Sequence, residues 1–213
     1  MKTRFIFFDL GNVLLRFSTA RLARQGAAVS GCGEFEVRQA VYGNGMQRKI
    51  ECGEISEADF YEAYCSRTGT RPEPEKLLAA LNDIFEVLEE TQPFVRRLVE
   101  IDFPRGVLSN VGISHWRHCT ETYPFLLECF PKNHVLSYEV GAMKPETKIF
   151  ESAFETARSA VPDIMPGEIF FLDDMEPNVV GARQFGLDAI QFISPEQIAL
   201  EIDRRGLGPF RFM

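Results

Sequence analysis

Two apolar runs in this chain end in carboxylates. Phe5-Ile6-Phe7-Phe8 is followed by Asp9, and Phe170-Phe171-Leu172 is followed by Asp173 and Asp174. A run without polar alternation predicts a strand buried on both faces, and parallel sheets bind ligands just beyond the carboxyl ends of such strands. Asp9 is therefore a candidate nucleophile, although an Asp just before a glycine turn is also ordinary turn chemistry.

These three carboxylates favour a metal ion if the two strands are neighbours in one sheet. At an effective dielectric of 20, two carboxylates a few ångströms apart repel by about 4 kcal/mol. A bound cation removes this repulsion, and ligation by a few carboxylate oxygens suits Mg²⁺, which is typically shared with a substrate phosphate. We therefore expect Mg²⁺ as the cofactor. Alternatively, Asp173 or Asp174 caps the helix that begins near Pro177.

Two further junctions carry polar groups suited to a phosphate. Ser109 and Asn110 end a short apolar run with a hydroxyl and an amide, which can hydrogen-bond phosphoryl oxygens. Lys144 precedes Pro145, and proline keeps the residue before it extended and favours the first turn of a helix. Ser-Asn pairs are common in turns and most lysines are solvated, so neither signal is specific alone. Together with the carboxylates they predict a site for phosphoryl transfer.

The elements that position these residues alternate between helix and strand from residue 91 onward, which is typical of a parallel sheet with crossover helices. Strands are predicted over 106–109, 135–137, 168–172 and 189–193. The first strand, which ends at Asp9, belongs to the same sheet. The predicted fold class is therefore α/β, with a Rossmann-like parallel sheet core flanked by helices and formed by residues 1–15 and 92–213.

The segment between these two parts, residues 16–91, is predicted to be an inserted all-helical cap domain without strands. A helix that begins near Pro74 carries an apolar face of Leu77, Leu78, Leu81, Ile84, Phe85 and Leu88. Substrate selection is expected in this cap, because the core motifs contact mainly the phosphoryl group. Gln47, Arg48, Lys49 and Glu51 lie between glycines and could reach the cleft, although an exposed loop or helix face is the commoner place for each.

Length and charge restrict the function classes. A chain of 213 residues can form one substantial core and a small second lobe. The net charge of −8 argues against binding to nucleic acid or to an anionic membrane, since both need clustered Lys and Arg. The five cysteines show no CxxC spacing and indicate neither a disulfide framework nor a zinc site. Asp9 interrupts the first apolar run too early for a signal peptide, so we expect a cytoplasmic protein. We expect this protein to be a monomer or a homodimer.

With these motifs in this order, the chain resembles the haloacid dehalogenase (HAD) superfamily of aspartate-nucleophile hydrolases over essentially its whole length. The four motifs of the family match residues 7–13, 108–110, 144–145 and 171–174, the last together with Asn178. The helical insertion after the first motif resembles the small helical cap of the family.

The resemblance implies roles for the acidic strand ends. Asp9 would attack phosphorus. Mg²⁺ would be held by Asp9, the Gly11 carbonyl and Asp174, with Asp173 assisting.

The resemblance also assigns the remaining polar residues. Ser109 and Lys144 would hold the transferred phosphoryl group, and Asn12 and Asn110 would contact the substrate. The expected activity is that of a Mg²⁺-dependent phosphatase, which forms an aspartyl-phosphate intermediate from a small phosphorylated metabolite.

Gly11 departs from the family pattern, because most phosphatases of the family carry a second aspartate there as general acid and base. Such catalysis typically contributes about 10²- to 10⁴-fold. Water or a cap residue could supply the proton, the substrate could have a good leaving group, or the protein could bind phosphorylated ligands while turning over poorly. The Asp-Leu-Gly-Asn-Val form of the motif resembles a subgroup that includes sugar-phosphate phosphatases, which favours an active enzyme.

Two other functions fit the four motifs less well than a phosphatase does. The metal-independent 2-haloacid dehalogenases of the family also lack the second aspartate, but they do not keep an acidic pair such as Asp173-Asp174. Bacterial receiver domains use an acidic pair, an acceptor aspartate, a hydroxyl and a Lys-Pro, but they place the pair in the first strand. Here Asp9 comes first and the pair comes late.

Overall fold

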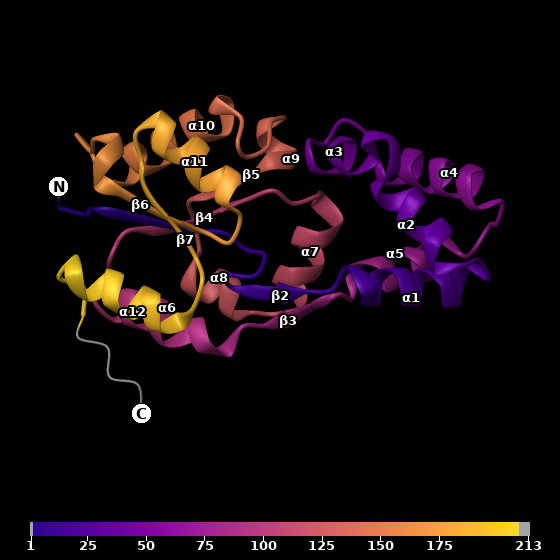
Figure 1. Ribbon diagram of the computed structural model, residues 1–213, viewed down its shortest axis with the longest axis horizontal. Helices are drawn as coiled ribbons and strands as arrows, with labels where there is room; N and C mark the ends of the chain where they lie inside the picture. The colour runs from indigo at the N-terminus through magenta and orange to yellow at the C-terminus, as the bar shows by residue number, and fades with distance from the viewer. Residues whose placement is uncertain (1, 209–213) are drawn as a thin grey trace.

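A five-stranded parallel sheet forms the centre of the protein, for which a computed structural model describes residues 2–208 (Figure 1). Its order is β5-β4-β1-β6-β7. The strands are β5 (His134–Leu136), β4 (Arg105–Ser109), β1 (Phe5–Phe8), β6 (Ile169–Asp173) and β7 (Asp188–Gln191). The predicted α/β class with a parallel sheet core is thus confirmed, and the predicted strands differ from these by one or two residues at their ends.

Strand β1 lies in the middle of the sheet because both of its faces are apolar. Phe7 pairs with Gly106 of β4 on one side and with Phe171 of β6 on the other. All four residues of β1 are fully buried. The continuous apolar run that the sequence shows is therefore the pattern of a central strand covered by helices on both faces.

Helices cover the two faces of the sheet (Figure 1). The side chains of β1 alternate between these two faces. Phe5 and Phe7 pack in a cluster with α10 (Thr147–Ala160) and α11 (Glu176–Phe185). Ile6 and Phe8 pack in the other cluster, which holds residues of α6 (Gln92–Glu100), α8 (Phe125–Cys129) and α12 (Pro195–Arg204). This three-layer arrangement fixes the carboxyl end of β1 in the middle of one edge of the sheet.

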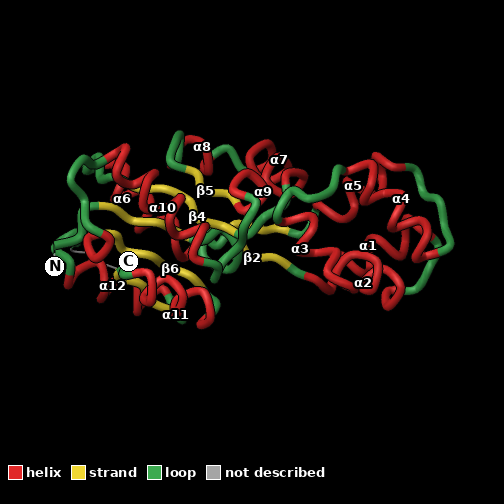
Figure 2. The backbone as a smooth tube through the Cα atoms, turned by 90° about the horizontal axis from the view of Figure 1, so that it is seen from above, coloured by secondary structure: helices red, strands yellow, loops and turns green. Residues whose placement is uncertain are grey.

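Five helices form a separate lobe beyond that edge, which we call the helical lobe (Figures 1 and 2). They are α1 (Thr19–Ser30), α2 (Glu34–Tyr42), α3 (Met46–Glu51), α4 (Glu57–Thr68) and α5 (Pro74–Asn82). Helix α4 begins at a capping box, in which Ser56 Oγ accepts from the Asp59 N–H and the Asp59 carboxylate accepts from the Ser56 N–H. The remaining short elements are η1 (Gly43–Gly45), η2 (Glu89–Thr91), α7 (Ile113–Thr122), α9 (Ser137–Val140) and η3 (Pro166–Glu168).

The expectation of a strand-free insertion was wrong at its two ends. β2 (Leu15–Phe17) and β3 (Phe85–Val87) pair antiparallel where the chain leaves the sheet and where it returns. Helix α5 ends at Asn82, so Phe85 lies in β3 and not on the apolar face of that helix. Phe85 is buried while Glu86 is exposed. Three alternating residues are too short a pattern to be distinguished from the end of a helix.

All five cysteines are free. Within residues 2–208, none of the helices is both long and apolar enough to cross a lipid bilayer.

Candidate active site

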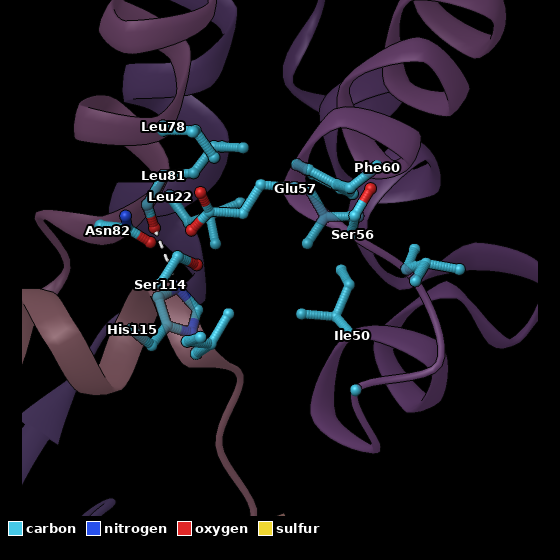
Figure 3. Close-up of a pocket in the computed structure, with 14 residues that line it drawn as sticks. Leu22, Ile50, Ser56, Glu57, Phe60, Leu78, Leu81, Asn82, Ser114 and His115 are labelled. Carbon is cyan, nitrogen blue, oxygen red and sulfur yellow. Dashed lines mark hydrogen bonds between the residues drawn. The ribbon is translucent and has the colours of Figure 1, made fainter. Parts of the chain in front are cut away.

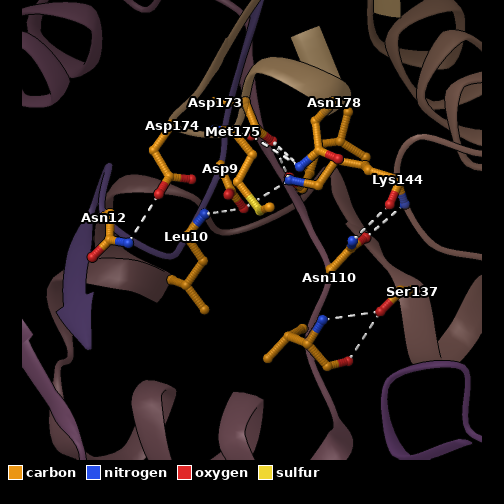
Figure 4. A network of polar contacts seen from close by, with 12 residues as sticks. Asp9, Leu10, Asn12, Asn110, Ser137, Lys144, Asp173, Asp174, Met175 and Asn178 are labelled. Carbon is orange, nitrogen blue, oxygen red and sulfur yellow. Dashed lines mark hydrogen bonds and ion pairs between the residues drawn. The ribbon is translucent and has the colours of Figure 1, made fainter. Parts of the chain in front are cut away.

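The polar strand ends meet at the carboxyl edge of the sheet (Figure 4). Asp9 directly follows β1, Ser109 ends β4, and Asp173 ends β6. Lys144 lies before α10 and reaches the same point, because its ammonium group contacts Asp9 and Asp173. The fold thus brings together four residues that the sequence analysis singled out separately.

Lys144 is the cation at the centre of this site. Its side chain is 1% exposed, and its Nζ lies 2.9 Å from Asp9 Oδ1 and 2.6 Å from Asp173 Oδ2. The same Nζ donates to the Leu108 carbonyl at 2.9 Å, so its three donors have three acceptors. Burial opposes the charge, but the two carboxylates outweigh burial and raise the pKa of Lys144. Lys144 therefore remains an ammonium in the folded protein.

Asp173 has its hydrogen-bonding capacity largely filled by protein groups (Figure 4). Besides Lys144, its carboxylate accepts from Asn178 Nδ2 at 2.9 and 3.1 Å and from the Met175 N–H at 2.8 Å. These bonds join the end of β6 to the start of α11 and fix the position of the Lys144 ammonium. Of the acidic pair, Asp174 is the residue whose carboxylate has more capacity left for a ligand.

Asp9, Asp173 and Asp174 form a carboxylate cluster in which one oxygen of each lies within 4.8 Å of the others. Burial raises the pKa of Asp9 to about 7, against the opposing charge of Lys144, and the nearby Asp173 raises it further. Burial also raises the pKa of Asp174. Three carboxylates meet one ammonium here, so the donor set and its charge fit a divalent cation.

Two residues that were expected to contact the substrate hydrogen-bond to other residues of the site. Asn12 donates from Nδ2 to Asp174 Oδ2 at 2.9 Å. Asn110 donates to the Lys144 carbonyl at 3.0 Å and accepts from the Lys144 N–H at 2.7 Å. Both amides therefore orient charged residues of the site. The sequence showed that these amides lie beside the motifs but not which way they point.

A pocket opens between these strand ends and the helical lobe, and we call it the polar pocket. Its volume is about 90 Å³. The core contributes Leu10, Gly11, Ser109, Asn110, Val111 and His115, and the lobe and its connecting strands contribute Phe17, Tyr42, Gln47, Glu51, Ile84 and Phe85. Of the stretch expected to reach the cleft, Gln47 and Glu51 do so. Arg48 pairs instead with Glu146 of the core.

Phe17 occupies the space beside Gly11. A Cβ atom built at position 11 would lie 3.1 and 3.3 Å from two carbons of the Phe17 ring. A side chain at this position would therefore require the Phe17 ring to move.

A second, mainly apolar cavity shares His115 with the polar pocket (Figure 3). Ile50 faces it together with Leu22, Phe60 and Leu81. Its charged lining residue, Glu57, pairs with Arg117 at 2.7 Å. Helix α3 thus directs Ile50 into the apolar cavity and the next residue, Glu51, into the polar pocket.

Glu51 is a residue of the polar pocket that was expected, with three neighbours, to reach the cleft. Its Oε1 accepts from Gln47 Nε2 at 2.9 Å, and its buried Oε2 has no hydrogen-bond partner among residues 2–208. Burial raises the pKa of Glu51 to about 7, although the Gln47 hydrogen bond and the charge of Lys144 oppose the change. The carboxyl is thus partly desolvated in the free protein.

The raised pKa of Glu51 predicts a pH-dependent stability difference. A carboxyl with a higher pKa in the folded state stabilises the protein below pH 4.5 and loses this contribution as pH rises to about 7. Glu51→Gln should therefore raise the free energy of unfolding by about 2 kcal/mol at about pH 8 and change it little at about pH 4.5. Urea denaturation at both pH values measures this difference.

Of the neighbouring groups, Asp9 also has a pKa of about 7, so its titration contributes equally to the pH dependence of the wild type and of Glu51→Gln. Burial raises the pKa of Tyr42 to about 12 and lowers that of His115 to about 4, and it also raises the pKa of Cys52. Lys144 stays charged. Glu54→Gln is the matched control, because Glu54 is about half-exposed and lies 3.9 Å from Arg48. A stability gain at pH 8 in both variants would contradict the assignment to Glu51.

Solved structures similar to this chain are HAD proteins. A HAD family enzyme from Bacteroides thetaiotaomicron has a TM-score of 0.80 and 24% identity, over 95% of this chain and 99% of that one. The same enzyme in complex with magnesium and inorganic phosphate gives a TM-score of 0.75 at 24% identity, over 89% and 93%. A protein from Porphyromonas gingivalis, described as a predicted HAD-like family hydrolase, gives 0.78 at 23% identity, over 96% and 98%.

A structure of a different activity is also similar. L-2-haloacid dehalogenase from Xanthobacter autotrophicus, with chloropropionic acid covalently bound, has a TM-score of 0.61 at 17% identity, over 97% of this chain and 85% of that one. No protein-family model matches the chain. The chain therefore has the fold of HAD family enzymes, as its four motifs predict. The similarity at these identities establishes the fold, and the reaction has to be argued from the site.

Proposed function

We propose that this protein is a Mg²⁺-dependent phosphatase that hydrolyses a small phosphorylated metabolite through an aspartyl-phosphate intermediate on Asp9. The observation that carries the proposal is the buried contact of Asp9 with Lys144, together with the nearby Asp174 carboxylate, at the carboxyl edge of the sheet. Phosphoryl transfer needs a nucleophile, cationic groups that neutralise charge, and fixed donors for the phosphoryl oxygens. The site supplies each of these.

The residues of the site divide the reaction between them. A carboxylate oxygen of Asp9 attacks phosphorus, the bond from phosphorus to the leaving oxygen breaks, and the leaving oxygen takes up a proton. Ser109 would hold the transferred group by its hydroxyl, and the Lys144 ammonium, which contacts Asp9, would neutralise charge on that group. Water then attacks the same phosphorus, which releases inorganic phosphate and restores the Asp9 carboxylate. Asn110 holds the Lys144 backbone, so it positions the ammonium during both steps.

Mg²⁺ is the metal that the carboxylate cluster fits best. Asp9, Asp174 and the Gly11 carbonyl would hold it, and Asp173 would act indirectly, because Lys144, Asn178 and Met175 already use its oxygens. A bound Mg²⁺ would neutralise the negative charge of the phosphoryl group. The magnesium and phosphate complex of the enzyme from Bacteroides thetaiotaomicron supports this choice.

We propose that the helical lobe is the cap that selects the substrate. Its residues Tyr42, Gln47 and Glu51 line the polar pocket opposite Leu10 and Ser109. These polar side chains suit a hydroxylated group such as a sugar. Screening purified protein with Mg²⁺ against sugar, nucleotide and acyl phosphates, with phosphate release as the readout, tests the proposed function directly.

Removal of the metal is expected to stop the reaction. Dialysis against EDTA should lower phosphate release by about 10²-fold or more, because the metal supplies several kcal/mol of transition-state stabilisation. Adding Mg²⁺ back should restore the rate. Halide release from a 2-haloacid, measured with and without chelator, is the parallel assay. Metal-independent halide release without phosphate release would replace this proposal by the dehalogenase alternative.

A further inference from the structure

The proposed phosphatase reaction requires a proton at the leaving oxygen, and the core of the site does not provide an evident donor. Position 11 is glycine, and the Phe17 ring occupies the space that its side chain would enter. Lys144 has all three donors on protein acceptors. General acid–base catalysis is typically worth about 10²- to 10⁴-fold, so a donor from elsewhere in the pocket would matter.

Glu51 reaches this pocket from the helical lobe. It lines the polar pocket together with Leu10, Gly11 and Ser109, which flank the candidate nucleophile and the phosphoryl site. Its Oε2 is buried and has no hydrogen-bond partner among the residues that the structure describes. A buried carboxyl oxygen without a partner is costly, and such an atom in a pocket is often satisfied by a ligand or by water.

The surroundings of Glu51 suit proton transfer. Burial raises its pKa to about 7, and the charge of Lys144 acts on it in the opposite direction. Glu51 therefore interacts electrostatically with the same ammonium that contacts Asp9. A carboxyl whose pKa lies near the working pH can both donate and accept a proton efficiently. Gln47 holds the other oxygen, Oε1, and so limits the rotation of the carboxyl group.

We propose that Glu51 is the general acid and base of this site and replaces the acid that is missing at Gly11; the inference rests on the proposed phosphatase function. In the first step the bond from phosphorus to the leaving oxygen breaks, and the protonated Glu51 gives its proton to that oxygen. In the second step the Glu51 carboxylate takes a proton from water as the water oxygen attacks the phosphorus of the aspartyl phosphate. The bond from phosphorus to Asp9 then breaks, and inorganic phosphate leaves.

This assignment places one catalytic group on the helical lobe and the nucleophile on the sheet. The two are brought together only where the lobe covers the carboxyl edge. Arg48 supports this arrangement, since it pairs with Glu146 just before α10 and so ties α3 to the core. Proton transfer by Glu51 would thus require the lobe to be closed over the substrate.

The dependence of the rate on the leaving group tests the proposal. A series of phosphate esters from p-nitrophenyl phosphate to simple alkyl phosphates is compared in the wild-type protein and in Glu51→Gln. An alkyl alkoxide needs a proton far more than p-nitrophenolate does. We expect kcat of Glu51→Gln to fall by about 10²-fold or more on alkyl phosphates. On p-nitrophenyl phosphate the fold decrease in kcat should be smaller by a factor of about ten or more.

Controls separate this inference from the proposed function. Glu54→Gln removes the same charge three residues away, where Glu54 lies near Arg48, and should leave the leaving-group dependence as in the wild type. Glu51→Asp keeps the carboxyl and should recover part of the loss. An equal loss of kcat on all esters, or a change in KM alone, would indicate that Glu51 only binds the substrate. Either result would overturn the inference about Glu51 and leave the proposed phosphatase function unaffected. If the wild-type protein hydrolyses none of the esters, both the inference about Glu51 and the proposed phosphatase function are wrong.

Discussion

Replacement of Asp9 by Asn is expected to reduce phosphate release by more than about 10³-fold, while the protein stays folded. An amide is too weak a nucleophile to attack phosphorus, and Asp173, the other carboxylate on Lys144, already accepts hydrogen bonds from Met175 and Asn178. The fold should tolerate the change because Asn is nearly the same size and can still accept from the Leu10 N–H, which now donates to Asp9 Oδ1 at 2.7 Å. Lys144 keeps its pair with Asp173.

Asp174→Asn provides the comparison for this variant. It removes a proposed metal ligand and leaves the nucleophile in place, so its activity should rise again at high Mg²⁺ concentration. A high Mg²⁺ concentration should not restore the activity of Asp9→Asn. Phosphate release is measured over a Mg²⁺ titration for both variants, and circular dichroism checks the fold. Sustained turnover by Asp9→Asn would show that another group is the nucleophile.

Labelling separates an active enzyme from a silent binding protein. Brief exposure of the wild type to a labelled phosphate ester should give a phosphorylated protein that turns over, and Asp9→Asn should give no label. Labelling of Asp9 without continued phosphate release would favour a weakly turning-over or regulatory protein, the outcome that Gly11 leaves open.

The parallel sheet could be predicted from sequence because its strands are buried on both faces. Such strands appear as uninterrupted apolar runs, and the polar residue that ends each run marks the carboxyl edge. Asp9, Ser109 and Asp173 were found in this way. Since parallel strands all end at the same edge, their sequence positions predicted their proximity, which the contacts with Lys144 show in the structure.

The direction of short polar side chains could not be predicted from the same pattern. Asn12 and Asn110 lie where substrate contacts were expected, yet their amides bind Asp174 and the Lys144 backbone. The difference depends on loop geometry. Asn12, for example, takes a left-handed conformation with φ of 53°. A motif gives the position of a residue along the chain, but the torsion angles of the loop decide what its side chain contacts.

The contribution of the helical lobe could be predicted in part, because Gln47 and Glu51 were expected to reach the cleft and do line the polar pocket. Arg48 and Lys49, from the same stretch on a six-residue helix, are not among its lining residues, and the local sequence did not show this difference. The packing of α3 against α2, η1 and α9 sets its rotation. Residues that come from an inserted lobe therefore need a structure before their role can be proposed.

Replacement of Lys144 by Met is expected to destabilise the protein as well as inactivate it. The ammonium is buried between Asp9 and Asp173, which are 7% and 0% exposed. Removing one partner of a buried ion pair typically costs about 3–5 kcal/mol, because the other charge is left without compensation. Here two carboxylates lose their counter-charge, so the loss should lie at the upper end of that range. Urea denaturation at neutral pH measures it.

The matched control is Lys148→Met, since Lys148 is the second residue of α10 and is exposed. That substitution should change the free energy of unfolding by less than about 0.5 kcal/mol. A double-mutant cycle with Asp173→Asn then shows where the cost arises. If the uncompensated charge of Asp173 causes the loss, the double variant should be more stable than Lys144→Met alone. Simple additivity would instead mean that Lys144 acts through packing against the Phe171 ring, which lies 5.3 Å from its Nζ.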